Sequence, residues 1–159
     1  MSKPMDNKWP QIAGEIRGDH HVLPVRVYYE DTDFSGFVYH ANYVKFCERG
    51  RSDCLRILGV HHHELDAQNT AQGVSGQAGF VVRKMNCEFL RPALIDYLLE
   101  VKTWFVLAKG ARMELRQSIW HDQTCLFKAD VTAALVDGNG RPKRLSPQMI
   151  EAFSALHAL

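Results

Sequence analysis

One short segment concentrates polar side chains that could act on an acyl carbonyl. Glu30, Asp31 and Asp33 place three carboxylates within four residues, Gly36 permits a tight backbone turn, and His40 follows seven residues after Asp33. A carboxylate held beside a carbonyl can activate water as a general base or attack the carbon as a nucleophile. Asp33 is the natural candidate for this role, and the sequence leaves both routes open.

The residues that follow predict a helix that would position this chemistry. From Asn42 to Leu58, apolar residues recur at spacings of three and four, and charged residues lie largely opposite them. A helix N-terminus offers free backbone N–H groups and a partial positive charge, so amides near residues 40–43 could stabilise an oxyanion. Gly50 falls on the apolar face, which we attribute to close approach of the helix to a sheet.

Strand-forming segments on both sides of this helix predict the sheet. One precedes it at residues 22–29, and the others lie roughly at residues 80–90, 97–107, 111–120 and 124–136. Their close spacing favours hairpins, so the expected fold class is α+β, with a curved antiparallel sheet of about five strands wrapped around one long central helix. Residues 1–20 suit a flexible N-terminal arm, and residues 21–159 suit a single domain.

Composition excludes several classes of function. The formal net charge of +1 removes any global electrostatic case for binding nucleic acid or an anionic membrane. No apolar run approaches the ~18 residues of a membrane span and no signal peptide is recognisable, so we expect a cytoplasmic protein. The cysteines form no C-x-x-C pair, which favours reduced core thiols. Adjacent His61, His62 and His63 cannot all converge on one ion, so no metal or other cofactor is expected.

The polar segment resembles the signature of the hotdog-fold 4-hydroxybenzoyl-coenzyme A thioesterase family, closest to its Tol-Pal system-associated acyl-CoA thioesterase branch. That signature reads Tyr-x-Asp-Thr-Asp, a small Gly-containing turn, and then Val-Tyr-His-Ala-Asn-Tyr. The matching positions here are Tyr29, Asp31, Thr32, Asp33, Gly36, Val38, Tyr39, His40, Ala41, Asn42 and Tyr43. A second similar segment, residues 88–93 followed by Asp96, corresponds to the strand-to-turn region of the family. Phe34 and Ser35 depart from it, because the family commonly has small Ala or Gly residues there.

The resemblance implies a fold, an activity and a set of site residues. The activity is hydrolysis of acyl-CoA thioesters, with Asp33 as the catalytic carboxylate and His40 assisting. The expected substrate-binding residues are Gly36, Tyr39, Tyr43, Lys109 and Arg112, of which the last two would meet the phosphates of coenzyme A. The resemblance also implies a homo-oligomer, either a dimer or a homotetramer, with its sites at the subunit interface.

Two alternative functions stay open at this point. The chain could be a non-catalytic acyl-thioester-binding or scaffold module of the cell-envelope system, which would not need a carboxylate at Asp33. It could also hydrolyse thioesters of acyl carrier protein, in which case the surface around Lys109 and Arg112 would accept an acidic protein and not only a nucleotide.

Overall fold

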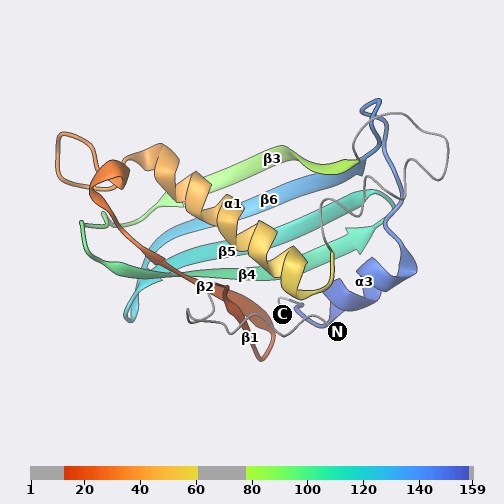
Figure 1. The fold of residues 1–159 in the computed structure, drawn as a ribbon, viewed down its shortest axis with the longest axis horizontal. Coiled ribbons are helices and arrows are strands. Elements are labelled where there is room, and N and C mark those ends of the chain that lie inside the picture. The colour runs from red at the N-terminus through yellow and green to blue at the C-terminus, as the bar shows by residue number, and fades with distance from the viewer. Residues whose placement is uncertain (1–12, 61–77, 158–159) are drawn as a thin grey trace, which may run out of the picture.

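A curved antiparallel sheet wraps around one long helix (Figure 1). The computed structural model describes residues 13–60 and 78–157, and these residues contain six strands in the order β1-β2-β4-β5-β6-β3. The strands are β1 (Glu15–Arg17), β2 (His20–Arg26), β3 (Gly79–Phe89), β4 (Leu98–Lys109), β5 (Arg112–His121) and β6 (Thr124–Val136). The helices are the 3-10 helix η1 (Tyr29–Asp31), α1 (His40–Ile57) and α3 (Pro147–Ser154). The predicted α+β class is confirmed.

The sheet begins earlier than the sequence indicated. β1 lies within residues 1–20, which we expected to form a flexible arm, and it pairs with β2 so that Ile16 lies opposite His21. All three residues of β1 are exposed, so no apolar alternation marks the strand in the sequence. The described sheet therefore has one strand more than the five expected. Residues 1–12 lie outside the described residues.

The apolar stripe of α1 packs mainly on β2, β4 and β5. The close approach expected at Gly50 is confirmed, because a Cβ atom added there would lie 2.8 Å from Val101 Cγ1 and 3.3 Å from Gln117 Nε2. Both neighbours project from the sheet. Gly50 thus lets the helix lie against the strands at a distance that a larger residue would not allow.

We expect Gly50→Ala to destabilise the protein by about 1–3 kcal/mol, because the added methyl group must displace Val101. The better helix propensity of alanine offsets about 1 kcal/mol of the loss. Thermal unfolding of the variant would measure it. Gly79→Ala is the control, since a Cβ atom at Gly79 would meet no atom of the described residues within 4 Å. If both variants unfolded like the wild type, the packing argument for Gly50 would be wrong.

A buried polar network fastens α1 to β2. Asp53 accepts hydrogen bonds from His21 Nε2 at 2.7 Å, from Gly14 N at 2.8 Å and from Arg56 Nη2 at 2.5 Å. Burial alone would raise the pKa of Asp53, but these hydrogen bonds outweigh it and hold the pKa below its ordinary value. Burial lowers the pKa of His21, and Asp53 only partly opposes this. His21 Nδ1 has no hydrogen-bond partner among the described residues, which also favours the neutral ring.

The thiols and the C-terminal segment complete the core. Cys47 and Cys54 are buried, and burial raises the pKa of each to about 12, so both stay protonated. Ser146 is the N-cap residue of α3, and its Oγ accepts a hydrogen bond from Met149 N at 3.2 Å. Within the described ranges, no helix combines the length and the apolar character that crossing a membrane requires.

Candidate active site

A tight hairpin presents Asp33 next to the start of α1. Asp33 N donates to Phe37 O at 3.0 Å, and Gly36 N donates to Asp33 O at 3.0 Å. Gly36 has φ +84°, which is the left-handed conformation that closes a three-residue hairpin loop. Gly36 therefore shapes the backbone of the loop that carries Asp33.

The Asp33 side chain is exposed and ionised. Its Oδ1 accepts from Ser35 N at 2.8 Å and also from the Ser35 hydroxyl. These two hydrogen bonds lower the pKa of Asp33, and the nearby His40 lowers it slightly further without forming a direct ion pair. No described residue bonds to Oδ2. One carboxylate oxygen thus positions the group, and the other is available for chemistry.

Asp31 clamps this hairpin to α1. Its Oδ2 accepts from Tyr28 N at 2.8 Å, and its backbone oxygen accepts from Tyr39 N at 2.9 Å and from Asn42 Nδ2 at 2.8 Å. Asp31 and Asn42 are both buried. These hydrogen bonds therefore fix the distance between the Asp33 loop and the helix.

The N-terminus of α1 has amides without partners. Tyr39 is the N-cap residue and provides no side-chain cap, and the first turn contains no acidic residue. The backbone N–H groups of His40 and Ala41 donate to no described residue. An oxyanion could accept from such amides and would be stabilised by the helix dipole. The side chains of Tyr39 and His40 are exposed, with ring centroids 4.4 Å apart.

Tyr43 lies behind this surface, in the core. It is only 4% exposed, and its hydroxyl accepts from Ala93 N at 2.9 Å. The hydroxyl is thus engaged within the chain and does not face open space.

Phe89 also lies at this site, although the sequence did not indicate it. It is 52% exposed, and its ring centroid lies 6.2 Å from that of His40 and 5.8 Å from that of Tyr43. The sequence gives no signal of this, because β3 and α1 are far apart in the chain.

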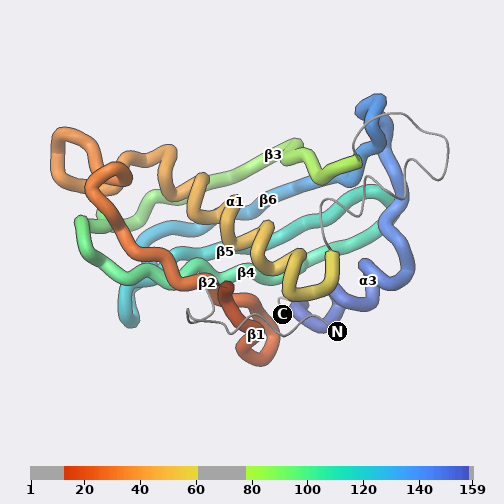
Figure 2. Tube along the Cα trace, in the orientation of Figure 1, coloured from red at the N-terminus to blue at the C-terminus, as the bar shows by residue number. Residues whose placement is uncertain are grey.

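The turn between β4 and β5 lies at the opposite end of the sheet from the loop that precedes α1 (Figure 2). Lys109 and Arg112 border this turn, whereas Asp33 belongs to that loop. β4 starts beside Arg26, near the Asp33 loop, and runs twelve residues away from it, so Lys109 lies about 36 Å along the strand. Arg112 Nη2 also pairs with Glu114 Oε1 at 2.8 Å. A single chain therefore does not bring these two predicted substrate-binding residues together with Asp33.

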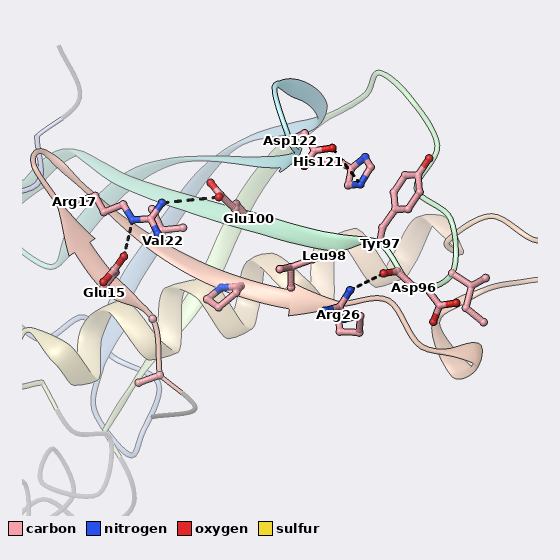
Figure 3. Close-up of a pocket in the computed structure, with 14 residues that line it drawn as sticks. Glu15, Arg17, Val22, Arg26, Asp96, Tyr97, Leu98, Glu100, His121 and Asp122 are labelled. Carbon is pink, nitrogen blue, oxygen red and sulfur yellow. Dashed lines mark hydrogen bonds and ion pairs between the residues drawn. The ribbon is translucent and has the colours of Figure 1, made fainter. Parts of the chain in front are cut away.

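Three cavities in the described part of the chain lie away from Asp33. One of about 810 Å³ opens between β1, β2, the start of β4 and the turn after β5 (Figure 3). It contains Arg26, which donates to Asp96 O at 2.7 Å, and the stacked rings of Tyr97 and His121. Cavities of about 360 Å³ and 220 Å³ lie over Trp104 and between β4 and α3. Asp33 and His40 line none of the three.

Within residues 13–60 and 78–157, no group of three or more His, Cys, Asp or Glu side chains is arranged to hold a metal ion. The run of His61, His62 and His63 lies outside the described residues.

The chain belongs to the thioesterase superfamily, whose family model matches residues 35–127. This match begins two residues after Asp33 and contains all of α1, strands β3, β4 and β5, and the first four residues of β6. The sheet-and-helix architecture is the hotdog fold that the sequence resemblance implied.

Named relatives carry the comparison further. The chain is 42% identical over 130 residues to the acyl-CoA thioester hydrolase YbgC of Escherichia coli O157:H7, which covers 81% of this chain and 91% of that protein. It is 37% identical over 135 residues to the acyl-CoA thioesterase YbgC of Haemophilus influenzae, covering 84% and 94%. A probable thioesterase from Bartonella henselae superposes with a TM-score of 0.74 at 43% identity, covering 80% of this chain and 99% of that one. The DHNA-CoA thioesterase of Staphylococcus aureus, at 21% identity and TM-score 0.74 over 85% and 89% of the chains, shares the fold.

Proposed function

We propose that this protein hydrolyses acyl-CoA thioesters to a free acid and coenzyme A. The observation that carries the proposal is an ionised Asp33 on a hairpin that Asp31 holds beside the N-terminus of α1. One oxygen of Asp33 and two amides of that N-terminus have no partner among the described residues. The 42% identity to an acyl-CoA thioester hydrolase supports the same substrate class.

The chemistry requires an attacking oxygen and a receptor for the carbonyl charge. Asp33 either removes a proton from water as it attacks the thioester carbon, or attacks that carbon itself and forms a mixed anhydride that water then cleaves. The backbone N–H groups of His40 and Ala41 donate hydrogen bonds to the developing oxyanion. The C–S bond breaks, and the coenzyme A thiolate leaves and takes up a proton. In this proposal His40 orients the carbonyl or the water.

A second copy of the chain would enclose the site, so we propose a homo-oligomer, a dimer or a tetramer. β3 pairs only with β6 among the described strands, and exposed apolar side chains surround the Asp33 loop, including Tyr29, Phe34, Phe37 and Phe89. In such an assembly Lys109 and Arg112 would serve the site of the partner subunit, since they cannot reach Asp33 in their own chain. The cytoplasmic location expected from the sequence stays a prediction.

Release of coenzyme A from a panel of acyl-CoA esters tests the proposal. The panel should include aliphatic and aromatic acyl groups and the same acyl groups on acyl carrier protein. We expect steady-state turnover of at least one coenzyme A ester. Binding of every ester without turnover would favour the scaffold alternative, and turnover of carrier-protein thioesters alone would favour the second alternative.

A further inference from the structure

Arg51, on α1, is a half-buried cation without an acidic partner in the described chain. Its Nη1 donates to Gln117 Oε1 at 2.9 Å, and no ion pair joins it to a described carboxylate. Burial lowers the pKa of Arg51, and Cys47 and Glu48 oppose this only in part. The other guanidinium N–H groups have no described acceptor. A guanidinium in this setting normally binds a carboxylate or a phosphate through two parallel hydrogen bonds.

The residue that holds Arg51 is itself rigidly placed. Gln117 is completely buried in β5, and its Nε2 donates to Cys47 O and to Thr103 Oγ1, both at 2.9 Å. A buried amide is stabilised only when its donors and acceptor are all satisfied. Both amide hydrogens are therefore used to aim the Gln117 carbonyl oxygen at Arg51, which gives the guanidinium a fixed orientation.

Arg51 lies on the same face of α1 as His40. It follows His40 by eleven residues, which corresponds to about 16 Å along a helix axis. Cys47 lies between them on that face and interacts electrostatically with both Arg51 and Cys87 of β3. The face thus points toward β3, whereas α1 packs mainly on β2, β4 and β5. His40, whose ring lies near that of Phe89, is at one end of this face, and Arg51 is farther along it.

We propose that Arg51 binds a carboxylate that comes from outside its own chain. One source is the far end of an acyl group whose thioester lies at His40 and whose chain extends in the direction of Arg51; this source rests on the proposed function. The other source is Glu48 of the partner subunit. Glu48 is exposed, and its only described hydrogen bond comes from Ser52 Oγ at 2.8 Å. A two-fold axis would form the pair of Arg51 and Glu48 twice.

The first arm of the test measures selectivity. We compare the wild type with Arg51→Met and with the control Arg49→Met, which changes an exposed arginine of the same helix. The substrates are monothioesters of dicarboxylic acids with coenzyme A and methyl-terminated coenzyme A esters of equal length. If the acyl group supplies the carboxylate, Arg51→Met lowers kcat/KM for the carboxylate-ended esters by about tenfold to a hundredfold relative to the others. Arg49→Met leaves the ratio unchanged.

The second arm measures association by sedimentation. If the partner subunit supplies the carboxylate, Arg51→Met and Glu48→Gln each raise the dissociation constant of the oligomer about tenfold or more, and Arg49→Met does not. This measurement does not depend on turnover, so it still tests the partner subunit as the source of the carboxylate even when the protein hydrolyses no ester. A folded Arg51→Met with unchanged selectivity and unchanged association overturns the proposal. Should that variant not fold, Arg51→Lys keeps the charge, removes the planar fork and is judged by the same two readouts.

Discussion

Asp33→Asn is expected to lower kcat about a thousandfold while substrate binding changes little. The amide has nearly the same shape and can still accept the hydrogen bond from Ser35 N, so the hairpin should keep its geometry. It can neither take a proton from water nor attack the thioester carbon. Steady-state hydrolysis of a good acyl-CoA ester, with substrate affinity measured separately, gives both quantities.

Glu30→Gln is the matched control, because Glu30 is an exposed carboxylate three residues earlier in the same segment. We expect its kcat to stay within about twofold of the wild type, since a surface substitution of this kind changes little. Equal rates for Asp33→Asn and wild type would reject the assigned chemistry. Equal losses in both variants would point to a general effect of charge on the loop.

The sequence was informative where structure follows from local pattern. The apolar spacing of residues 42–58 and the small residue at Gly50 predicted both the helix and its contact with a sheet, and the structure has both. The position of Gly36 predicted a tight turn, and its φ of +84° agrees. β1 escaped detection because all of its residues are exposed, so neither face carries an apolar signal.

The sequence was uninformative where function depends on pairs that are distant in the chain. Gln117 meets Arg51 across 66 positions, and His21 meets Asp53 across 32, so no local motif contains either pair. For Lys109 and Arg112, the sequence indicated a suitable chemistry but not the position of the residues in space. Their residue types suit phosphate binding, but the length of β4 separates them from Asp33, and only an assembly of chains can join them.

Asp53→Ala is expected to lower the free energy of unfolding by about 3–5 kcal/mol, because each of two donors left without an acceptor inside the protein costs about 1–3 kcal/mol. The change leaves His21 Nε2 and the Gly14 N–H without an acceptor and loosens α1 from β2. Urea denaturation of the variant and the wild type measures this difference in the free energy of unfolding. Asp130→Ala is the control, because Asp130 forms an exposed pair with Arg116 at 3.2 Å, and such pairs contribute only about 0–1 kcal/mol. Similar losses in both variants would mean that the Asp53 network is not buried in solution.

The same network predicts that stability decreases in mild acid. Because the pKa of His21 is lowered in the folded protein, the unfolded chain binds a proton first as the pH falls below the ordinary value of 6.5. The unfolded state then gains stability by up to about 1.4 kcal/mol per pH unit for this one proton. Asp53 acts at lower pH: its pKa is also lowered, so its contribution is present above 3.8 and is lost as the pH falls through the folded value. Urea denaturation at pH 7.5 and pH 5 should show a lower free energy of unfolding at pH 5 for the wild type and for the control His121→Gln. The difference between the two pH values should be smaller in His21→Gln, which keeps an N–H donor for Asp53. An unchanged slope in His21→Gln would assign the acid sensitivity to another group.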